Sequence, residues 1–368
     1  GIVALKNVEI VGSSVTAADG VVIDATKFTN VNTFQVGSGG ALAPANNAAN
    51  AAGDVAASFT FAAGDTLSIA ANVTGGTSAA GDASGGDAIN ATAAVNSGTD
   101  VLNLSVDAGA AVTVTGGAST DGTADGGNVS GDALDASTVE TINISTASAL
   151  DDITFVAGTA AGADTAGSSV SVGANATINI TGAGDVNLGT VVASGGATVD
   201  DLTIDGSAMT GALTVTTGAG NDTIKGGSKA DTIDAGTGVN TVTLGGGADT
   251  LKVADGSSNP TAGLTSVTDF AFGAGNDKID FSGAAAVTFE ALTSANATAI
   301  AADASLGDAL TQAMSQLDAD QATAFVYGGD AYVVFNDATD NTFDNGADAV
   351  VKLTGVTDVS GLDVTQIM

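Results

Sequence analysis

Four nonapeptides that follow one another without a gap decide how this chain folds. They read TGAGNDTIK (217–225), GGSKADTID (226–234), AGTGVNTVT (235–243) and LGGGADTLK (244–252). Each begins with six residues rich in glycine, which tolerates the positive φ angles of tight turns. Each ends with three residues whose middle member is apolar, as in a short strand that rests on a narrow core. The repeat therefore predicts a solenoid in which turns and very short strands alternate.

The period of nine residues also predicts how the turns stack. Two nonapeptides complete one coil, so turns two repeats apart lie on the same edge of the solenoid. The sixth position of successive repeats holds Asp222, Asp231, Asn240 and Asp249. We expect Asp222 to share an ion with the turn that carries Asn240. We expect Asp231 to share a second ion with the turn that carries Asp249.

The chemistry of these turns favours calcium. Carboxylate and backbone carbonyl oxygens are the hard ligands that Ca²⁺ prefers, and the sequence matches the pattern G-G-x-G-x-D-x-U-x of calcium-binding β-rolls. We predict that several Ca²⁺ ions are bound. Besides the four sixth-position residues, the candidate metal-site residues in the turns are Gly218, Gly220, Gly227, Gly236, Gly238, Gly245 and Gly247.

Two repeats depart from the pattern, and a fifth copy stands apart from the block. Lys229 replaces the glycine of the fourth position and Asn240 replaces an aspartate, so we expect those two turns to bind calcium more weakly. A turn array without any ion is the alternative. Residues 272–280 read FGAGNDKID; this segment resembles a closing coil, in which Asp277 is a further candidate ligand.

The composition excludes several classes of function. The chain has 368 residues, of which 41 are acidic and seven basic, and it contains no histidine or cysteine. Zinc sites of the usual kind, haem ligands and nucleophiles activated by histidine are therefore excluded. A net charge of −34 repels nucleic acid and anionic membranes. We expect no enzyme; a polysaccharide-active hydrolase with two aspartates stays open, although the chain has no tryptophan and two tyrosines.

Short alternating runs fill the first 215 residues, for example VLNLSV (101–106) and TINI (141–144). Three similar segments precede such runs: IDAT (23–26), LDAS (134–137) and IDGS (204–207). Aspartate and hydroxyl side chains bond nearby backbone amides in turns. We predict an all-β fold with a parallel β-helix or β-roll solenoid. A β-sandwich with similar corners is the alternative for the N-terminal part.

Three regions are expected along the chain: a strand-rich repeat region at 1–215, the calcium-binding β-roll at 216–260 and a capping, secretion-signal region at 261–368. Within the first, residues 75–132 are rich in glycine and aspartate and are expected to form long loops, coil corners or a flexible linker. The C-terminal cap is predicted to contain one short helix, over 303–317.

The evidence for that helix is a start signal followed by an apolar face. Ser305 and Asp308 resemble a capping box, and Leu306, Leu310 and Met314 then share one side of the helix. Further along, four aspartates cluster around a predicted hairpin turn: Asp337, Asp340, Asp344 and Asp348. They form either a further calcium site or a solvated acidic turn.

No apolar stretch reaches the roughly 18 residues that a membrane helix needs, and no signal peptide is visible at the N-terminus. The chain begins with Gly1, in the middle of strand-like sequence. We therefore expect it to be the C-terminal part of a longer protein.

At this point the sequence resembles the RTX proteins of Gram-negative bacteria, which leave the cell by type I secretion, and among them it looks most like the surface-layer (S-layer) proteins. Besides the nonapeptides, the tail segments FVYGGDAYVV (325–334) and DNGADAVVKLTGV (344–356) carry this resemblance. It covers residues 200–368 well and 1–200 only in style.

The resemblance implies uncleaved C-terminal export information, folding triggered by calcium outside the cell, and assembly into a two-dimensional lattice. The expected partners are other copies of the chain and the outer cell surface, through lipopolysaccharide bound by a missing N-terminal part. No nucleic-acid partner and no membrane span are expected. An RTX adhesin or a biofilm-matrix filament is the alternative function.

Overall fold

The structure is a computed structural model. It describes residues 8–9, 21–27, 32–36, 56–75, 86–95, 99–118, 130–160, 167–193, 200–261, 263–273, 276–282, 287–337, 343–344, 347–362 and 364–368. The chain divides into two compact units. The N-terminal unit comprises residues 1–197 and 208–215, and the C-terminal unit comprises residues 198–207 and 216–368. The expected boundaries at 215/216 and 260/261 remain predictions.

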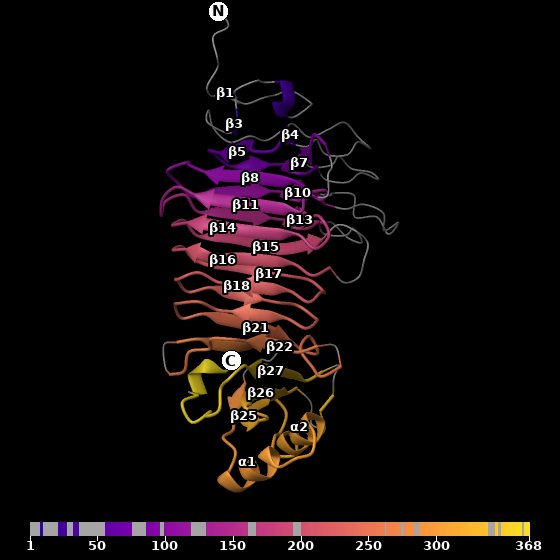
Figure 1. Cartoon of the computed structure of the whole chain (residues 1–368), viewed down its shortest axis with the longest axis vertical. Coiled ribbons are helices and arrows are strands. Elements are labelled where there is room, and N and C mark those ends of the chain that lie inside the picture. The colour runs from indigo at the N-terminus through magenta and orange to yellow at the C-terminus, as the bar shows by residue number, and fades with distance from the viewer. Residues whose placement is uncertain are drawn as a thin grey trace, which may run out of the picture. The chain divides into compact units, whose positions relative to one another are not determined.

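Parallel strands build the N-terminal unit, and Figure 1 shows them stacked one above another. One sheet contains β1 (Val8–Glu9), β3 (Thr33–Val36), β5 (Thr66–Ile69), β8 (Val101–Val106), β11 (Thr141–Thr146) and β14 (Thr177–Gly182). The second contains β2 (Val21–Asp24), β4 (Ala57–Phe61), β7 (Ile89–Ala93), β10 (Leu134–Ala136), β13 (Val170–Val172), β15 (Val186–Ala193) and β17 (Leu213–Thr216). The short strands β6 (Val73–Thr74), β9 (Val112–Thr115) and β12 (Ile153–Val156) pair with one another and with β15.

The alternation seen in the sequence explains these strands. In β11 and β14 the isoleucines are buried, while the threonines and asparagines between them face outward. The asparagines form a ladder: Asn143 Nδ2 donates to Asn103 Oδ1 and Asn179 Nδ2 donates to Asn143 Oδ1, each over 2.9 Å. The predicted parallel β-helix is confirmed, and the parallel pairing does not fit a β-sandwich, whose sheets are antiparallel.

The repeated aspartate-hydroxyl segments form the same local turn at three strand ends. The carboxylates of Asp24, Asp135 and Asp205 accept hydrogen bonds from the backbone amides two residues later, over 3.0 to 3.1 Å. The glycine-rich stretch at 75–132 contains coil corners, as the bonds from Gly75 N to Thr115 O and from Gly117 N to Gly86 O show. It also contains β7, a strand that the sequence did not predict.

The C-terminal unit has parallel strands of its own, followed by antiparallel ones. Its larger sheet contains β16 (Thr203–Met209), β18 (Thr223–Lys225), β20 (Thr241–Thr243), β22 (Thr265–Val267), β27 (Ala349–Leu353), β26 (Asp330–Asn336), β25 (Gln321–Tyr327) and β24 (Thr288–Phe289). The smaller contains β19 (Thr232–Asp234), β21 (Thr250–Ala254) and β23 (Lys278–Ser282). Pairing becomes antiparallel at β25, β26 and β27, which ends the parallel stack.

Two short helices cover this end, where one was predicted. α2 (Leu306–Met314) is the predicted helix in a shorter form, and Ser305 Oγ accepts a hydrogen bond from Asp308 N over 3.2 Å, so the capping signal is confirmed. α1 (Ser294–Ala301) was missed because it buries one residue, Ile300, and therefore lacks an apolar face. A single-turn 3₁₀ helix, Val364–Gln366, follows near the C-terminus.

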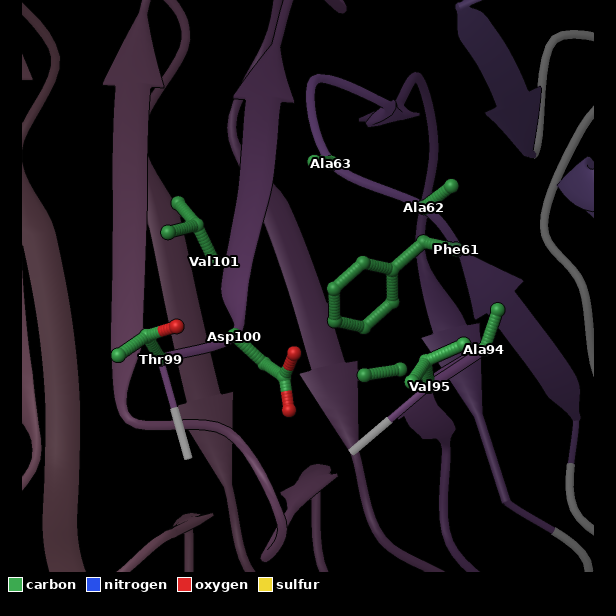
Figure 2. A pocket seen from close by; sticks show the side chains of 9 residues that line it. Phe61, Ala62, Ala63, Ala94, Val95, Thr99, Asp100 and Val101 are labelled. Atoms are coloured by element: carbon green, nitrogen blue, oxygen red, sulfur yellow. The ribbon is translucent and has the colours of Figure 1, made fainter. Parts of the chain in front are cut away.

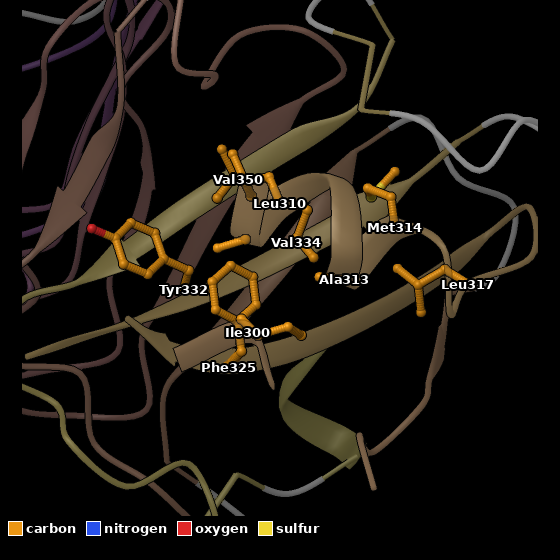
Figure 3. Close-up of a cluster of buried hydrophobic side chains, with 10 residues drawn as sticks. Ile300, Leu310, Ala313, Met314, Leu317, Phe325, Tyr332, Val334 and Val350 are labelled. Carbon is orange, nitrogen blue, oxygen red and sulfur yellow. The ribbon is translucent and has the colours of Figure 1, made fainter. Parts of the chain in front are cut away.

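The cap has its own hydrophobic core. Figure 3 shows Leu310, Ala313 and Met314 of α2 lying over the hairpin of β25 and β26. The rings of Phe325 and Tyr332 stack with centroids 5.6 Å apart. Among the described residues, no helix has the length and apolar character that a membrane crossing requires.

Candidate calcium sites

The strand register places turns two repeats apart on the same edge, as predicted. Ile224 of β18 lies beside Val242 of β20, and Ile233 of β19 lies beside Leu251 of β21. The turns 217–222 and 235–240 therefore share what we call the first edge. The turns 226–231 and 244–249 share the second edge.

Glycine is required where stacked turns approach each other. Gly236 has a φ of +59°, and a Cβ there would clash with Gly218 O of the turn before it. Gly245 has a φ of +95°, and a Cβ there would clash with Gly227 O. The remaining predicted turn glycines with positive φ are Gly220, Gly238 and Gly247. Gly218 has open space around it, so its glycine is not explained by crowding.

Three side chains, those of Asn240, Asp249 and Asp277, reach back toward the preceding turn on their edge. Asn240 Oδ1 accepts from Asp222 N over 2.9 Å, and Asp249 Oδ1 accepts from Asp231 N over 2.8 Å. In the same way, Asp277 Oδ1 accepts from Asp249 N over 3.1 Å. Every such side chain thus lies between its own turn and the one stacked before it.

These carboxylates are buried, which makes their negative charge unfavourable. Asp222, Asp231, Asp249 and Asp277 are each almost fully buried. Burial, followed by the nearby carboxylates of Asp277 and Asp231, raises the pKa of Asp249 to about 7. Burial also raises the pKa values of Asp222 and Asp277. The Oδ2 atoms of Asp222 and Asp249 have no hydrogen-bond partner, which is costly unless a cation is present.

The oxygen atoms needed to hold such a cation come from neighbouring turns. Gly226 lies against both Asp231 Oδ2 and Leu244 O, so closely that a Cβ would clash with each. No three acidic side chains converge anywhere in the described part of the chain. Each ion would therefore be held by one or two carboxylates together with backbone carbonyls, a donor set that suits Ca²⁺.

Comparison with known protein families agrees with this geometry. Residues 216–251 match the RTX calcium-binding nonapeptide repeat in four copies. The chain carries RTX repeats. RTX nonapeptide repeats bind calcium ions, so Ca²⁺ is the cofactor of this segment. A comparison with curated proteins found no match. RTX repeats indicate a secreted, calcium-binding surface or structural protein.

The two RTX repeats that depart from the pattern differ in how they are satisfied. Asn240 donates from Nδ2 to Ala235 O over 2.8 Å and to Thr265 Oγ1 over 3.4 Å, so a neutral amide fills the place of a carboxylate. Lys229 is exposed and its φ is not positive, so its turn does not repeat the backbone of Gly220. Weaker calcium binding at these turns remains a prediction.

The side chain of Asp222 does not point toward the turn that carries Asn240. Its Oδ1 accepts from Leu202 N over 2.8 Å, on the coil before the RTX repeats. The side chain between the turns 217–222 and 235–240 is therefore that of Asn240. Asp222 touches this position through its backbone amide.

The predicted sites outside the block meet different surroundings. Asp277 Oδ2 accepts from Ala271 N over 2.7 Å, and its strand β23 pairs with β21 as a following coil. Asp348 is buried and accepts from Asp337 N over 3.1 Å and from Asp344 N over 2.6 Å. The backbone amides of Asp337 and Asp344 thus meet at the carboxylate of Asp348, while Asp340 lies outside the described residues. Their role in binding calcium stays a prediction.

Two further aspartates belong to the edges although the RTX pattern does not include them. Asp269 accepts from Leu244 N over 2.8 Å and from Gly245 N over 2.9 Å, which holds the second edge. Asp200 is buried, and its Oδ2 atom has no hydrogen-bond partner. The only sequence signal was the pair Asp200-Asp201 in front of a strand-like run.

A small pocket in the N-terminal unit has a different character. Its volume is about 340 Å³, and it lies between Phe61 and Asp100 (Figure 2). Most of the described side chains around it are small and apolar, as in Ala62, Ala94 and Val101. Asp100 is the one acidic group among them, so this lining does not supply the pair of carboxylates that sugar hydrolysis uses.

Proposed function

We propose that the protein is a structural subunit of a bacterial surface layer, and that it assembles with copies of itself into a two-dimensional lattice when calcium is bound. It acts at the cell surface and without catalysis in this proposal. The observation that carries it is an uncharged sheet face on a chain with a net charge of −34.

We call this surface the neutral face. It consists of the outward residues of β3, β5, β8, β11 and β14 in the N-terminal unit. Their strands contain no acidic or basic residue. The outward residues are Thr33, Gln35, Thr66, Val101, Asn103, Ser105, Thr141, Asn143, Ser145, Thr177, Asn179 and Thr181; Ser68 of β5 is buried.

The parallel register aligns these side chains in columns. Asn103, Asn143 and Asn179 lie directly beside one another, and Ser145 lies beside Thr181. Ser145 and Thr181 are exposed. The face is thus a regular array of hydroxyl and amide groups on a parallel sheet, with strands about 4.8 Å apart.

Charge favours a second copy of the chain as the occupant of this face. Two molecules of the same high negative charge repel each other over most of their surfaces. The neutral face avoids that repulsion, and its hydroxyl and amide groups both donate and accept hydrogen bonds. Calcium bound in the turns lowers the remaining repulsion. Assembly that requires calcium follows from these two effects together.

The same array supports a second candidate, an adhesin or matrix protein that binds a neutral polysaccharide. Hydroxyl and amide groups hydrogen-bond sugars as readily as they bond another chain. Attachment to the outer cell surface through lipopolysaccharide is also part of the proposal, and imaging of intact cells tests it.

Electron microscopy of the purified protein tests the lattice. We expect ordered sheets with calcium and dispersed particles after chelation. The double variant Ser145→Asp/Thr181→Asp adds two stacked charges to the neutral face and should abolish the sheets. The control Thr60→Asp/Thr92→Asp adds the same charges to stacked residues of β4 and β7 and should keep them. Dispersed wild-type protein in calcium, or sheets in both variants, contradicts the proposal, and binding of neutral polysaccharide by that dispersed protein favours the adhesin.

A further inference from the structure

We propose that a calcium site lies one coil before the RTX repeats, where Asp200 meets Asp222 and Thr217. The RTX pattern ends at Thr216 on this side, so Asp200 lies outside it. The proposal uses the calcium chemistry of the repeats and is independent of lattice assembly.

The segment before the repeats takes the place of a preceding turn. Thr203 of β16 lies beside Thr223 of β18, and Thr223 N donates to Leu202 O over 2.8 Å. Asn221 N donates to Asp201 Oδ1 over 2.7 Å. Residues 200–202 therefore stack on residues 220–222, as one RTX turn stacks on the next along the same edge.

Three oxygen atoms in this layer are buried and have no hydrogen-bond partner: Asp200 Oδ2, Asp222 Oδ2 and Thr217 Oγ1. Their residues are 8%, 1% and 3% exposed, respectively. A buried polar atom without a partner is destabilising, and a buried carboxylate even more so. Three such atoms on two adjoining segments are what a bound cation would satisfy.

Gly220 lies where oxygen atoms of the two segments come close together. Asp200 O lies so close to Gly220 that a Cβ there would clash with it, and Asp222 Oδ1 lies 3.1 Å from the same Cβ position. A backbone carbonyl of one coil and a carboxylate of the next thus border a residue that has no side chain. This is the arrangement that Gly226 shows on the second edge between Leu244 O and Asp231 Oδ2.

The charge and the donor atoms select a divalent cation. Two carboxylates, a hydroxyl and a carbonyl are hard oxygen donors, which suit Ca²⁺. The ammonium group of Lys225 is engaged by Asp205 at 3.1 Å. The other ion pairs of the described residues go to Asp24 and Asp330. A protein cation therefore does not neutralise Asp200 and Asp222.

Calcium counting on the full chain tests the site. Native mass spectrometry and isothermal titration with CaCl₂ should show one ion fewer in Asp200→Asn than in the wild type. The matched control is Asp201→Asn, which removes an exposed carboxylate next to the site and should keep the full number. Equal counts in Asp200→Asn and the wild type overturn the proposal, as does the loss of one ion from Asp201→Asn alone.

A second variant keeps the proposal testable if Asp200→Asn does not fold. Thr217→Val removes the unpartnered hydroxyl while keeping its shape, and it should weaken one calcium step about tenfold and leave the other steps unchanged. The result that overturns the proposal is a titration identical to that of the wild type. Loss of every step would show that the repeats themselves are disrupted, which also contradicts an effect confined to this site.

Discussion

The coils of the N-terminal unit and those of the RTX repeats use the same parallel pairing but are held together differently. Asn103, Asn143 and Asn179 are paired in β8, β11 and β14. Successive asparagines are 40 and 36 residues apart in the sequence, which is the length of one coil. Coils of this length enclose large side chains. Phe34, Phe59 and Phe61 are buried there, with ring centroids 5.7 and 5.8 Å apart. A coil of this length can bury enough apolar surface to stay folded without bound calcium.

An RTX coil of 18 residues contributes far less. Ile224 pairs with Val242, and Ile233 pairs with Leu251, so each three-residue strand buries one aliphatic side chain. The turns meanwhile bury carboxylates, which opposes folding. A shortened coil thus exchanges apolar burial for metal binding. The N-terminal unit should therefore tolerate loss of calcium, whereas the repeats should not.

Removal of calcium should give the largest effect and tests the comparison directly. Each ion at a thousand times its Kd stabilises the folded state by about 4 kcal/mol. With EGTA, we expect hydrogen exchange to accelerate strongly in residues 217–252 and to change little in β8, β11 and β14. Mass spectrometry of peptides from both regions measures this. Equal acceleration in both regions, or none in either, would contradict the distinction.

Truncation of one buried isoleucine in each region should have a smaller effect. Ile178→Ala in β14 creates a cavity and should lower the free energy of unfolding by about 2–5 kcal/mol, with or without calcium. Ile233→Ala in β19 should do so at pH 8 only with calcium, because at that pH the calcium-free coil is not folded. Denaturant titrations with calcium and with EGTA measure both variants. A calcium-independent loss in Ile233→Ala would argue that the repeat coil folds by apolar burial.

The smallest expected effect concerns pH in calcium-free protein. Burial first, then Asp277 and Asp231, raises the pKa of Asp249 from 3.8 to about 7. A raised pKa means that the folded state binds the proton more tightly than the unfolded chain does. The resulting stabilisation is complete below the ordinary pKa and is lost as the pH rises through 7, with a slope of at most about 1.4 kcal/mol per pH unit.

Exchange of residues 244–252 in protein and buffers freed of calcium on a chelating resin should therefore be slower at pH 5 than at pH 8, after correction for the intrinsic rate. Asp249→Asn removes the titrating group and should flatten this dependence. The neighbouring change Asp280→Asn, in β23, leaves the column of buried carboxylates intact and should keep it. An unchanged slope in Asp249→Asn would assign the effect to another group.

Much of this architecture could be predicted because short-range patterns determine it. The nine-residue period predicted the stacking of alternate turns, and the alternation of isoleucine with threonine or asparagine predicted strands. The recurring aspartate-hydroxyl segments favoured a parallel β-helix over a β-sandwich. Helix α1 was not predicted because its interior is mostly alanine and small polar residues. Its position depends on Ile300 packing into the cap, a contact that cannot be predicted from the local sequence.

The candidate sites show the same limit. The identity of the sixth-position residues follows from the repeat, but the direction in which each side chain reaches does not. Asp222 turns toward Leu202, a residue that no repeat pattern relates to it. Asp200 escapes the pattern because its part in the column depends on which segment stacks before the first repeat, and that is a tertiary relation.

The backward reach of the sixth-position side chains gives the column of turns a polarity. Asp277 binds the amide of Asp249, and Asp249 binds the amide of Asp231. A turn that is already ordered therefore presents an acceptor to the turn before it, while receiving its own acceptor from the turn after it. Folding of the repeats would then start at the end nearest the helical cap and advance toward the N-terminus, one coil serving as the template for the next.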